Sequence, residues 1–382
     1  MIWLPYRLTQ ALPTRARLRK AWAASPVFRA QREYKRRWSV AASATSRRAF
    51  RSDPLAVCLC RIVGNDLFPR HRSGQAVENL RTILQVESNP FGWRKLFVLN
   101  RFVDQQLEHE AVEAVRRAGH DCDVIPFDAE AYQSLRYRPE FFGGVNYFSS
   151  PEFLAKDPFT QDRERIWACG EKIRYLMNIN GARNQALAFG RTSSDWTFVL
   201  DGSCFVPEGA FHAFRQDLQA LPSVPYLVVP MLRQSDEQDL TRVAVSSAYQ
   251  EEPQIAFRSD AVEQFDEVYP YGVRDKTSLL DRLGVPGPWC AWTPLPWLPE
   301  ADRRSADRYL FKYASASVLR LTSGIANGSL ELPRAQMKRY RSRITAIFAT
   351  LQAMDCQCEA ADSAVLSGIV GQSLNSESDS CL

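Results

Sequence analysis

The sequence contains no run of about 18 uncharged apolar residues, the length that a helix needs to cross a bilayer. We therefore expect no transmembrane helix. Residues 1–20 also lack the continuous apolar segment and the small-residue cleavage site of a secretory signal. Both absences favour a cytoplasmic location.

Cysteine and histidine are scarce, with nine and four residues in a chain of 382. An odd, low cysteine count in a chain of this length excludes a disulfide scaffold and favours a reducing compartment. Cys58 and Cys60 alternate in an apolar run and are predicted to be buried. Cys356 and Cys358 have no second pair at zinc-binding spacing, and the four histidines share no metal-binding spacing. We interpret these residues as structural.

Three catalytic or phosphate-binding motifs are missing. The chain has no G-x-x-x-x-G-K-[ST] and no G-x-G-x-x-G, which excludes a P-loop and a dinucleotide-binding fingerprint. It also has no G-x-S-x-G, which argues against a hydrolase with a nucleophile elbow.

Positive charge is concentrated at one end of the chain. Residues 1–52 hold 13 of the 48 basic residues and one of the 43 acidic residues, so the net charge of +5 comes from this segment. A basic segment with interspersed aromatic residues can contact an anionic membrane from the cytoplasmic side. It can also form a solvated helix on the body of the protein. Contact with nucleic acid is the third alternative, and we expect no nucleic-acid partner.

The segment after the basic extension alternates between strand and helix patterns. The expected strands are 55–63, 95–100 and 122–127, and the expected helices are 74–87 and 104–119. This order predicts an α/β fold with a mostly parallel central sheet. Ligands bind such sheets beyond the carboxyl ends of the strands, where polar residues follow the first strand.

The rest of the chain is less regular. We expect an irregular segment over 129–165, a helix over 171–190 interrupted at Gly181, strands over 196–200 and 226–232, no regular helix over the proline-rich 284–299, helices over 305–321 and 334–354, and disorder from Gly371. The predicted division is a basic helical extension (1–52), a catalytic domain (53–300), a C-terminal helical segment (301–370) and a disordered tail (371–382).

The strand over 196–200 ends in Asp201, Gly202 and Ser203. A short acidic turn at a strand end can hold Mg²⁺ or Mn²⁺ beside a nucleotide diphosphate. Here the third position is a neutral serine, and the alternative is a turn in which Asp201 binds nearby backbone amides. Upstream, Asn180, Arg183 and Asn184 lie on one helix face, where an arginine can bind a phosphate through two nitrogens.

These residues carry a family resemblance. The segment "ARNQAL…G…DWTFVLDGSCFVPEGA", over 182–210, resembles the central signature of GT-A glycosyltransferases, closest to the family-2 type. The first strand with "RIVGND" resembles that family's nucleotide-binding strand and loop. The resemblance covers roughly residues 55–270. It implies a Rossmann-like GT-A fold, a nucleotide-sugar donor and a divalent metal.

The resemblance also implies positions for the site. It places Arg61, Asn65 and Asp66 near the base and ribose of the donor. It places Asn180, Arg183 and Asn184 near the donor sugar or the diphosphate. It assigns the metal to Asp201 and Ser203.

The base and the leaving-group cations are predicted from charge and order along the chain. An inverting transferase needs a carboxylate to take the acceptor proton. The candidates are Glu251, Glu252, Asp260 and Asp275, of which we favour Glu252. Arg274 and Lys276 are predicted to stabilise the departing diphosphate, with a solvated helix start as the alternative. Three tryptophans of the proline-rich loop can either contact sugar faces or pack over the sheet: Trp289, Trp292 and Trp297.

The sequence thus favours a glycosyltransferase that moves a sugar from a nucleotide sugar to a glycan or lipid-linked acceptor. Such an activity suits cell-surface glycan or glycolipid synthesis at the inner face of a membrane. Two alternatives stay open. One is a nucleotidyl- or phosphosugar transferase, and the other is a non-catalytic GT-A-like scaffold at a membrane surface, to which the neutral Ser203 points.

Overall fold

The computed structural model describes residues 55–220, 224–233, 252–273, 275–287, 289, 305–321, 332–359 and 362–371. The basic extension, most of the proline-rich loop with Trp292 and Trp297, and the tail after Gly371 lie outside these residues. Among the described helices, none combines the length and the apolar character that a bilayer span requires.

A seven-stranded sheet forms the centre of the molecule, in the order β3-β2-β1-β4-β8-β6-β9. Its strands are β1 (Val57–Gly64), β2 (Arg94–Asn100), β3 (Asp121–Ile125), β4 (Trp196–Asp201), β6 (Tyr226–Val229), β8 (Gln254–Arg258) and β9 (Phe311–Tyr313). Only β8 runs antiparallel to its neighbours β4 and β6 among these strands. The predicted α/β fold with a mostly parallel sheet is confirmed.

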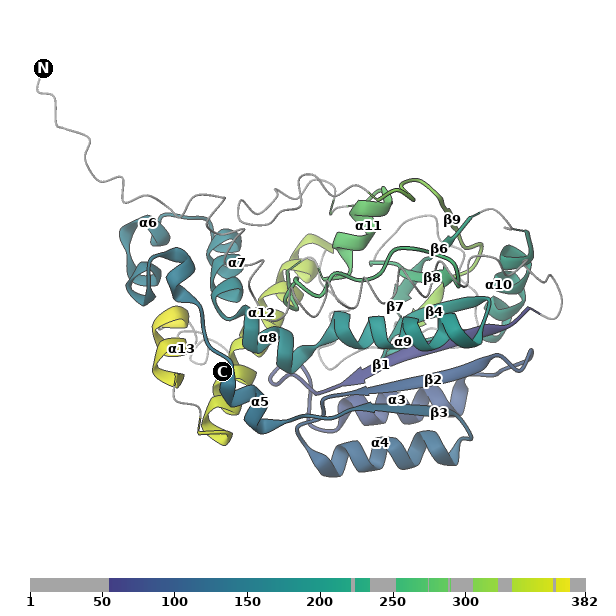
Figure 1. Cartoon of the computed structure of the whole chain (residues 1–382), viewed down its shortest axis with the longest axis horizontal. Helices are drawn as coiled ribbons and strands as arrows, with labels where there is room; N and C mark the ends of the chain where they lie inside the picture. The colour runs from purple at the N-terminus through teal and green to yellow at the C-terminus, as the bar shows by residue number, and fades with distance from the viewer. Residues whose placement is uncertain are drawn as a thin grey trace, which may run out of the picture.

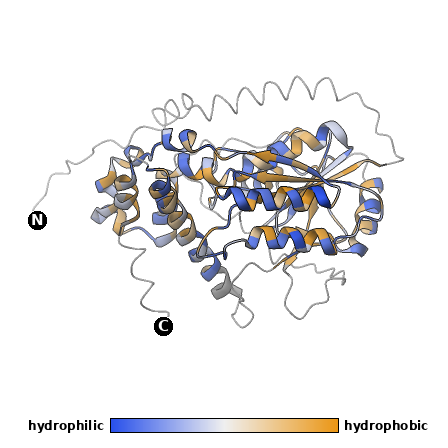
Figure 2. Cartoon of the chain, turned by 90° about the horizontal axis from the view of Figure 1, so that it is seen from below, coloured by the Kyte–Doolittle hydropathy of each residue, from blue (hydrophilic) through white to orange (hydrophobic). Residues whose placement is uncertain are grey.

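Two helical layers cover the sheet (Figure 1). On one face, α9 (Ile179–Ser193) packs Ala182 and Ala186 against the Cys58 and Cys60 side of β1. On the other face, α3 (Gln75–Val86) and α4 (Gln105–Arg117) pack against the opposite side chains of β1 and β2. Both cysteines are fully buried, as predicted. Figure 2 shows hydrophobic residues concentrated in the central strands and helices with mixed faces.

Two further units join the sheet. A three-stranded sheet pairs β5 (Cys204–Phe205), β10 (Val318–Arg320) and β7 (Met231–Arg233). At the left end of Figure 1, a helical unit packs around its own apolar core. It contains α5 (Ala129–Ser134), η1 (Pro139–Phe142), η2 (Val145–Ser149), α6 (Pro151–Leu154), α7 (Pro158–Ala168), α8 (Gly170–Met177), α12 (Leu332–Gln357) and α13 (Ser363–Val370).

A buried polar network holds the C-terminal helices on this unit. The Lys172 ammonium on α8 donates to Asp355 and Asp362, each at 2.7 Å. Asp355 also accepts from the hydroxyls of Tyr132 and Tyr137, at 2.8 and 2.6 Å. The charge of this buried lysine is therefore matched by carboxylates of the C-terminal segment.

Three predictions about local structure are wrong. Residues 129–165 are largely helical, because prolines begin η1, α6 and α7 instead of preventing them. The helix over 171–190 breaks at Asn178, which takes a left-handed conformation (φ 38°), and not at Gly181. Residues 305–321 form turns with β9 and β10 instead of a helix, because these strands pair with β6, β5 and β7. The helix predicted over 334–354 is confirmed as α12, but it is not the last helix, because α13 follows it.

Candidate functional site

The most suggestive position in the sheet lies between β1 and β4. From β1 the chain proceeds through β2 to β3 on one side, whereas β4 pairs with β1 on the other side. This is a topological switch point, where the connections diverge and leave a crevice beyond the carboxyl ends of the strands. A pocket opens there, lined by the ends of β1 and β4 and by the first turns of α3. We call it the switch-point pocket.

The Asp201-Gly202-Ser203 turn forms one wall of this pocket. Asp201 is the last residue of β4 and is in register with Ile62 of β1. Its Oδ1 accepts from Arg183 Nη2 at 2.9 Å, and its Oδ2 accepts from Gln254 Nε2 at 3.1 Å and from Lys276 Nζ at 3.3 Å. Burial alone would raise the pKa of Asp201, but Lys276, Arg183 and Arg320 together hold it well below its ordinary value. Asp201 is therefore an anion surrounded by cations.

Arg183 reaches the pocket from the buried face of α9. Its guanidinium donates from Nη2 to Asp201. It also donates from Nη1 to Asn180 Oδ1 at 2.9 Å and to Asp275 Oδ2 at 3.5 Å. The side chain is 5% exposed and lines the pocket. Burial opposes its charge, but the two carboxylates outweigh burial and raise its pKa. The structure thus places Arg183, which was predicted to lie near the donor sugar or diphosphate, in the pocket beside Asp201.

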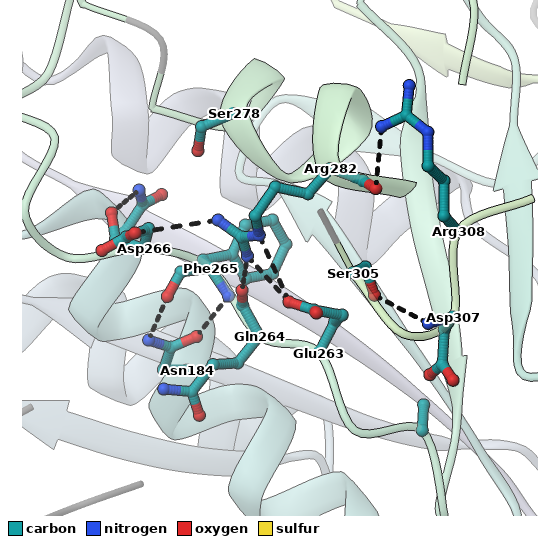
Figure 3. Close-up of polar contacts among 12 residues, drawn as sticks. Asn184, Glu263, Gln264, Phe265, Asp266, Ser278, Arg282, Ser305, Asp307 and Arg308 are labelled. Carbon is teal, nitrogen blue, oxygen red and sulfur yellow. Dashed lines mark hydrogen bonds and ion pairs between the residues drawn. The ribbon is translucent and has the colours of Figure 1, made fainter. Parts of the chain in front are cut away.

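Asn180 and Asn184 do not line the pocket. Asn180 Nδ2 donates to the carbonyls of Asp266 and Asp275, at 2.8 and 3.1 Å. Asn184 donates to the Phe265 carbonyl at 2.9 Å and accepts from the Phe265 N–H at 2.9 Å (Figure 3). Both asparagines were predicted to lie beside the donor. In the structure they instead bind the segment over 265–275, which leads to Lys276.

A second anchor fixes the same segment from the other side. Arg282, on α11 (Thr277–Leu283), donates to the Glu263 carboxylate at 3.0 Å and to the Gln264 carbonyl at 2.7 Å (Figure 3). Lys276 immediately precedes α11, so these bonds position its backbone. Lys276 is 3% exposed, and its ammonium also donates to the Glu252 carbonyl at 3.3 Å. The predicted cation is therefore brought to Asp201 by tertiary contacts.

The three residues predicted from the first strand have different surroundings. Arg61 is fully buried on the other face of β1, where it pairs with Glu87 and donates from Nε to the Cys204 carbonyl at 2.8 Å, so it does not line the pocket. Asn65 lines the pocket, but its amide binds the Arg101 carbonyl at 2.6 Å and the Val103 N–H at 2.8 Å. The structure separates Arg61 from the predicted base and ribose site.

Asp66 also lines the pocket, and only one of its two carboxylate oxygens has a hydrogen-bond partner among the described residues. Its Oδ1 accepts from the Ala76 N–H at 2.9 Å, at the start of α3. Its Oδ2 is buried and has no hydrogen-bond partner among the described residues. Burial raises the pKa of this carboxyl. An acceptor of this kind suits a ligand hydroxyl or N–H.

Sequence reasoning missed four basic side chains of the pocket. Arg70 and His71 come from the β1–α3 loop, Arg320 from β10 and Arg343 from α12, and all four line the pocket. Arg320 Nε donates to Ser203 Oγ at 3.1 Å. Burial, with Arg70 and Arg320 nearby, lowers the pKa of His71 to about 4. No local motif signals this group, because its members lie up to 273 positions apart and meet only in the folded chain.

Comparison with known proteins gives structural matches only. No family model and no curated protein matches the sequence. The mannosyltransferase PcManGT from Pyrobaculum calidifontis, solved with GDP-Man and Mn²⁺, matches over 97% of this chain and 88% of its own, at 12% identity and a TM-score of 0.35. TarS 1–349 from S. aureus, solved with UDP, matches over 85% of this chain and 74% of its own, at 10% identity and a TM-score of 0.32.

Because the identities are 10–12% and both TM-scores are below 0.5, these matches do not carry an activity over to this chain.

The candidate bases can be ranked by position. Glu252 and Asp275 line the switch-point pocket, whereas Asp260 does not and pairs with Arg258 at 2.6 Å. Glu251 and Arg274 lie outside the described residues. Because the Asp275 carboxylate is paired with Arg183, Glu252 is the better candidate for a proton acceptor. Trp289 is 5% exposed in an apolar core cluster and so packs over the sheet instead of facing a sugar.

The residues around Asp201 do not fit a divalent cation. Mg²⁺ and Mn²⁺ need several oxygen ligands, often more than one of them carboxylate. Here both oxygens of Asp201 face nitrogen donors, and Ser203 Oγ accepts from Arg320. Among the described residues, no three acidic, cysteine or histidine side chains gather as a metal site would require.

Proposed function

We propose that this protein is a glycosyltransferase that binds a nucleotide-sugar donor in the switch-point pocket. The observation that carries the proposal is the Asp201 carboxylate held between Arg183 and Lys276 at this position of the sheet. An ordered cluster of opposite charges in a crevice at the strand ends suits a charged ligand such as a nucleotide diphosphate. The signature over 182–210 supports a sugar nucleotide over other nucleotides.

In this proposal, each end of the donor meets different groups. The nucleoside lies beside the β1–α3 loop, where Asp66 Oδ2 accepts from a ribose hydroxyl or a base N–H. The diphosphate lies beside Arg183 and Arg320. These cations stabilise the negative charge that grows on the diphosphate as the sugar departs.

The chemical step is a displacement at the anomeric carbon. The acceptor hydroxyl forms a new bond to this carbon, and the bond from the carbon to the diphosphate oxygen breaks. The acceptor proton passes to the Glu252 carboxylate, and the bonding electrons leave with the diphosphate. Glu252 is suited to this role because it lines the pocket and its backbone carbonyl is held by Lys276 at 3.3 Å.

The acceptor is proposed from the class of enzyme. A glycan or lipid-linked acceptor at the inner face of a membrane suits a chain whose residues 1–52 are strongly basic. In this view the catalytic domain is cytoplasmic and the extension contacts anionic lipid.

The decisive experiment measures release of nucleoside diphosphate from a panel of nucleotide sugars, together with thermal shifts by the same compounds. We expect one nucleotide sugar to raise the unfolding temperature and to be hydrolysed slowly without acceptor. Glu252→Gln should keep the thermal shift and lose at least about 100-fold of the release rate. Glu208→Gln, at an exposed carboxylate on α10 (Glu208–Ala220), is the matched control and should change neither.

Two other outcomes would replace this function. Release of pyrophosphate from a nucleoside triphosphate and a phosphosugar would identify a nucleotidyl- or phosphosugar transferase. If no nucleotide binds, and anionic liposomes are bound until residues 1–52 are removed, the chain is a membrane scaffold.

A further inference from the structure

Both oxygens of Asp201 are occupied by nitrogen donors. Oδ1 accepts from Arg183, and Oδ2 accepts from Gln254 and Lys276. Of the cations that stabilise the ionised Asp201, Arg183 and Arg320 line the pocket, whereas Lys276 does not. These cations repel a divalent ion and attract an anion.

Lys276 occupies the oxygen that a metal would need. Its Nζ lies 3.3 Å from Asp201 Oδ2 and 3.3 Å from the Glu252 carbonyl oxygen. An ammonium has three N–H donors, and these two contacts use two of them. Lys276 is 3% exposed and does not line the pocket, so its role is to neutralise Asp201 where a metal would otherwise bind.

The neutral residue at position 203 agrees with this arrangement. An ammonium carries one positive charge where a metal carries two, so a single carboxylate is enough to balance it. Ser203 Oγ accepts from Arg320 Nε at 3.1 Å and thereby orients another cation that lines the pocket. Ser203 therefore binds Arg320 at the position where a second acidic residue would bind a metal.

We propose that the donor diphosphate is bound by Arg183 and Arg320 instead of a divalent metal, with Lys276 occupying the Asp201 oxygen that a metal would need, and that this site binds nucleoside diphosphates without Mn²⁺ or Mg²⁺. This inference rests on the proposed function, because it names the groups that hold the donor. It differs from the metal-assisted site that the sequence resemblance implies.

The test is calorimetric titration of UDP and GDP into the full chain, once in EDTA and once in MnCl₂. We expect the dissociation constant of the nucleotide that binds to agree within about twofold between the two conditions. Arg320→Met should weaken binding at least about tenfold, and Mn²⁺ should not restore it. Lys312→Met, at an exposed lysine of β9, is the matched control and should bind as the wild type does.

The outcomes separate the two proposals. If EDTA abolishes binding to the wild type and Mn²⁺ restores it, the metal-free site is overturned while nucleotide binding stands. If neither nucleotide nor any nucleotide sugar binds in either condition, both proposals fall. The wild-type comparison decides the question even if Arg320→Met does not fold, which its unfolding temperature will show.

Discussion

Gly202 lies directly against the main chain of Ile62: a Cβ at position 202 would be 2.3 Å from the Ile62 carbonyl oxygen. Real Cβ atoms essentially never come so close to an oxygen, so only glycine fits between β4 and β1 at this point. The close approach lets the turn bend away with Asp201 and Ser203 on the wall of the switch-point pocket. The packing of two strand ends therefore explains the glycine of the turn.

Gly202→Ala should push the turn away from β1. We expect a loss of about 1–3 kcal/mol in the free energy of unfolding, and weaker nucleotide binding, because Asp201 moves with the turn. Chemical denaturation and calorimetry measure the two effects. Thr192→Ala, at an exposed residue of α9, is the control. Unchanged stability and binding would mean that the turn does not depend on this contact.

Glu87→Ala should be among the most destabilising changes in this chain. Glu87 is buried between Arg61 and Lys95, and it also accepts from the Val206 N–H at 2.7 Å. Its removal leaves two buried cations together, which costs about 3–5 kcal/mol of unfolding free energy. Glu110→Ala removes a solvent-accessible pair with Arg81 and should cost far less unfolding free energy than Glu87→Ala. Equal losses for the two variants in urea would contradict the prediction.

Asp66→Asn should separate stability from binding. Because burial raises the pKa of Asp66, the folded state binds more protons than the unfolded state just above the ordinary value of 3.8, and this carboxyl lowers stability as the pH rises through that window. The asparagine should therefore leave stability near pH 7 unchanged or higher. Nucleotide binding should weaken about tenfold, because a charged acceptor is lost.

Denaturation curves and calorimetric titrations of the wild type and Asp66→Asn supply both numbers. An Asp66→Asn protein that binds nucleotide as tightly as the wild type would show that this carboxylate does not contact the ligand.

Asp201 has the opposite pH dependence. Its folded pKa lies below the ordinary value of 3.8, so its contribution to stability is present above that value and is lost as the pH falls through the folded pKa. Asp201→Asn leaves Arg183 and Lys276 without their shared anion, and we expect a loss of about 3 kcal/mol near pH 7. The difference between variant and wild type should shrink in acid. Urea denaturation at several pH values tests this, and a constant difference would refute it.

The sequence by itself determined the alternation of elements and singled out two residues of the site. The periodic apolar residues of β1, α3, β2, α4 and β3 are local signals, and they predict the parallel sheet correctly. The acidic turn and the arginine of the upstream helix were also found from sequence, since Arg183 and Asp201 are only 18 positions apart on adjoining elements.

Only the tertiary structure decided which side chains face the pocket. Spacing places Asn180, Arg183 and Asn184 on one helix face, but it does not reveal that the two asparagines bind the 265–275 segment while the arginine reaches Asp201. Arg61 sits in the first strand as predicted, yet the alternation of side chains across the sheet directs it to Glu87 on the other face.

The remaining surprises share one physical reason. Residues 305–321 contain no strong strand signal, and they become β9 and β10 because existing strand edges offer them hydrogen bonds. Arg320 and Arg343 join the pocket through the same long-range packing. Local sequence encodes backbone preference, whereas the partner of a side chain depends on segments far away in the chain, and only the folded structure brings those segments together.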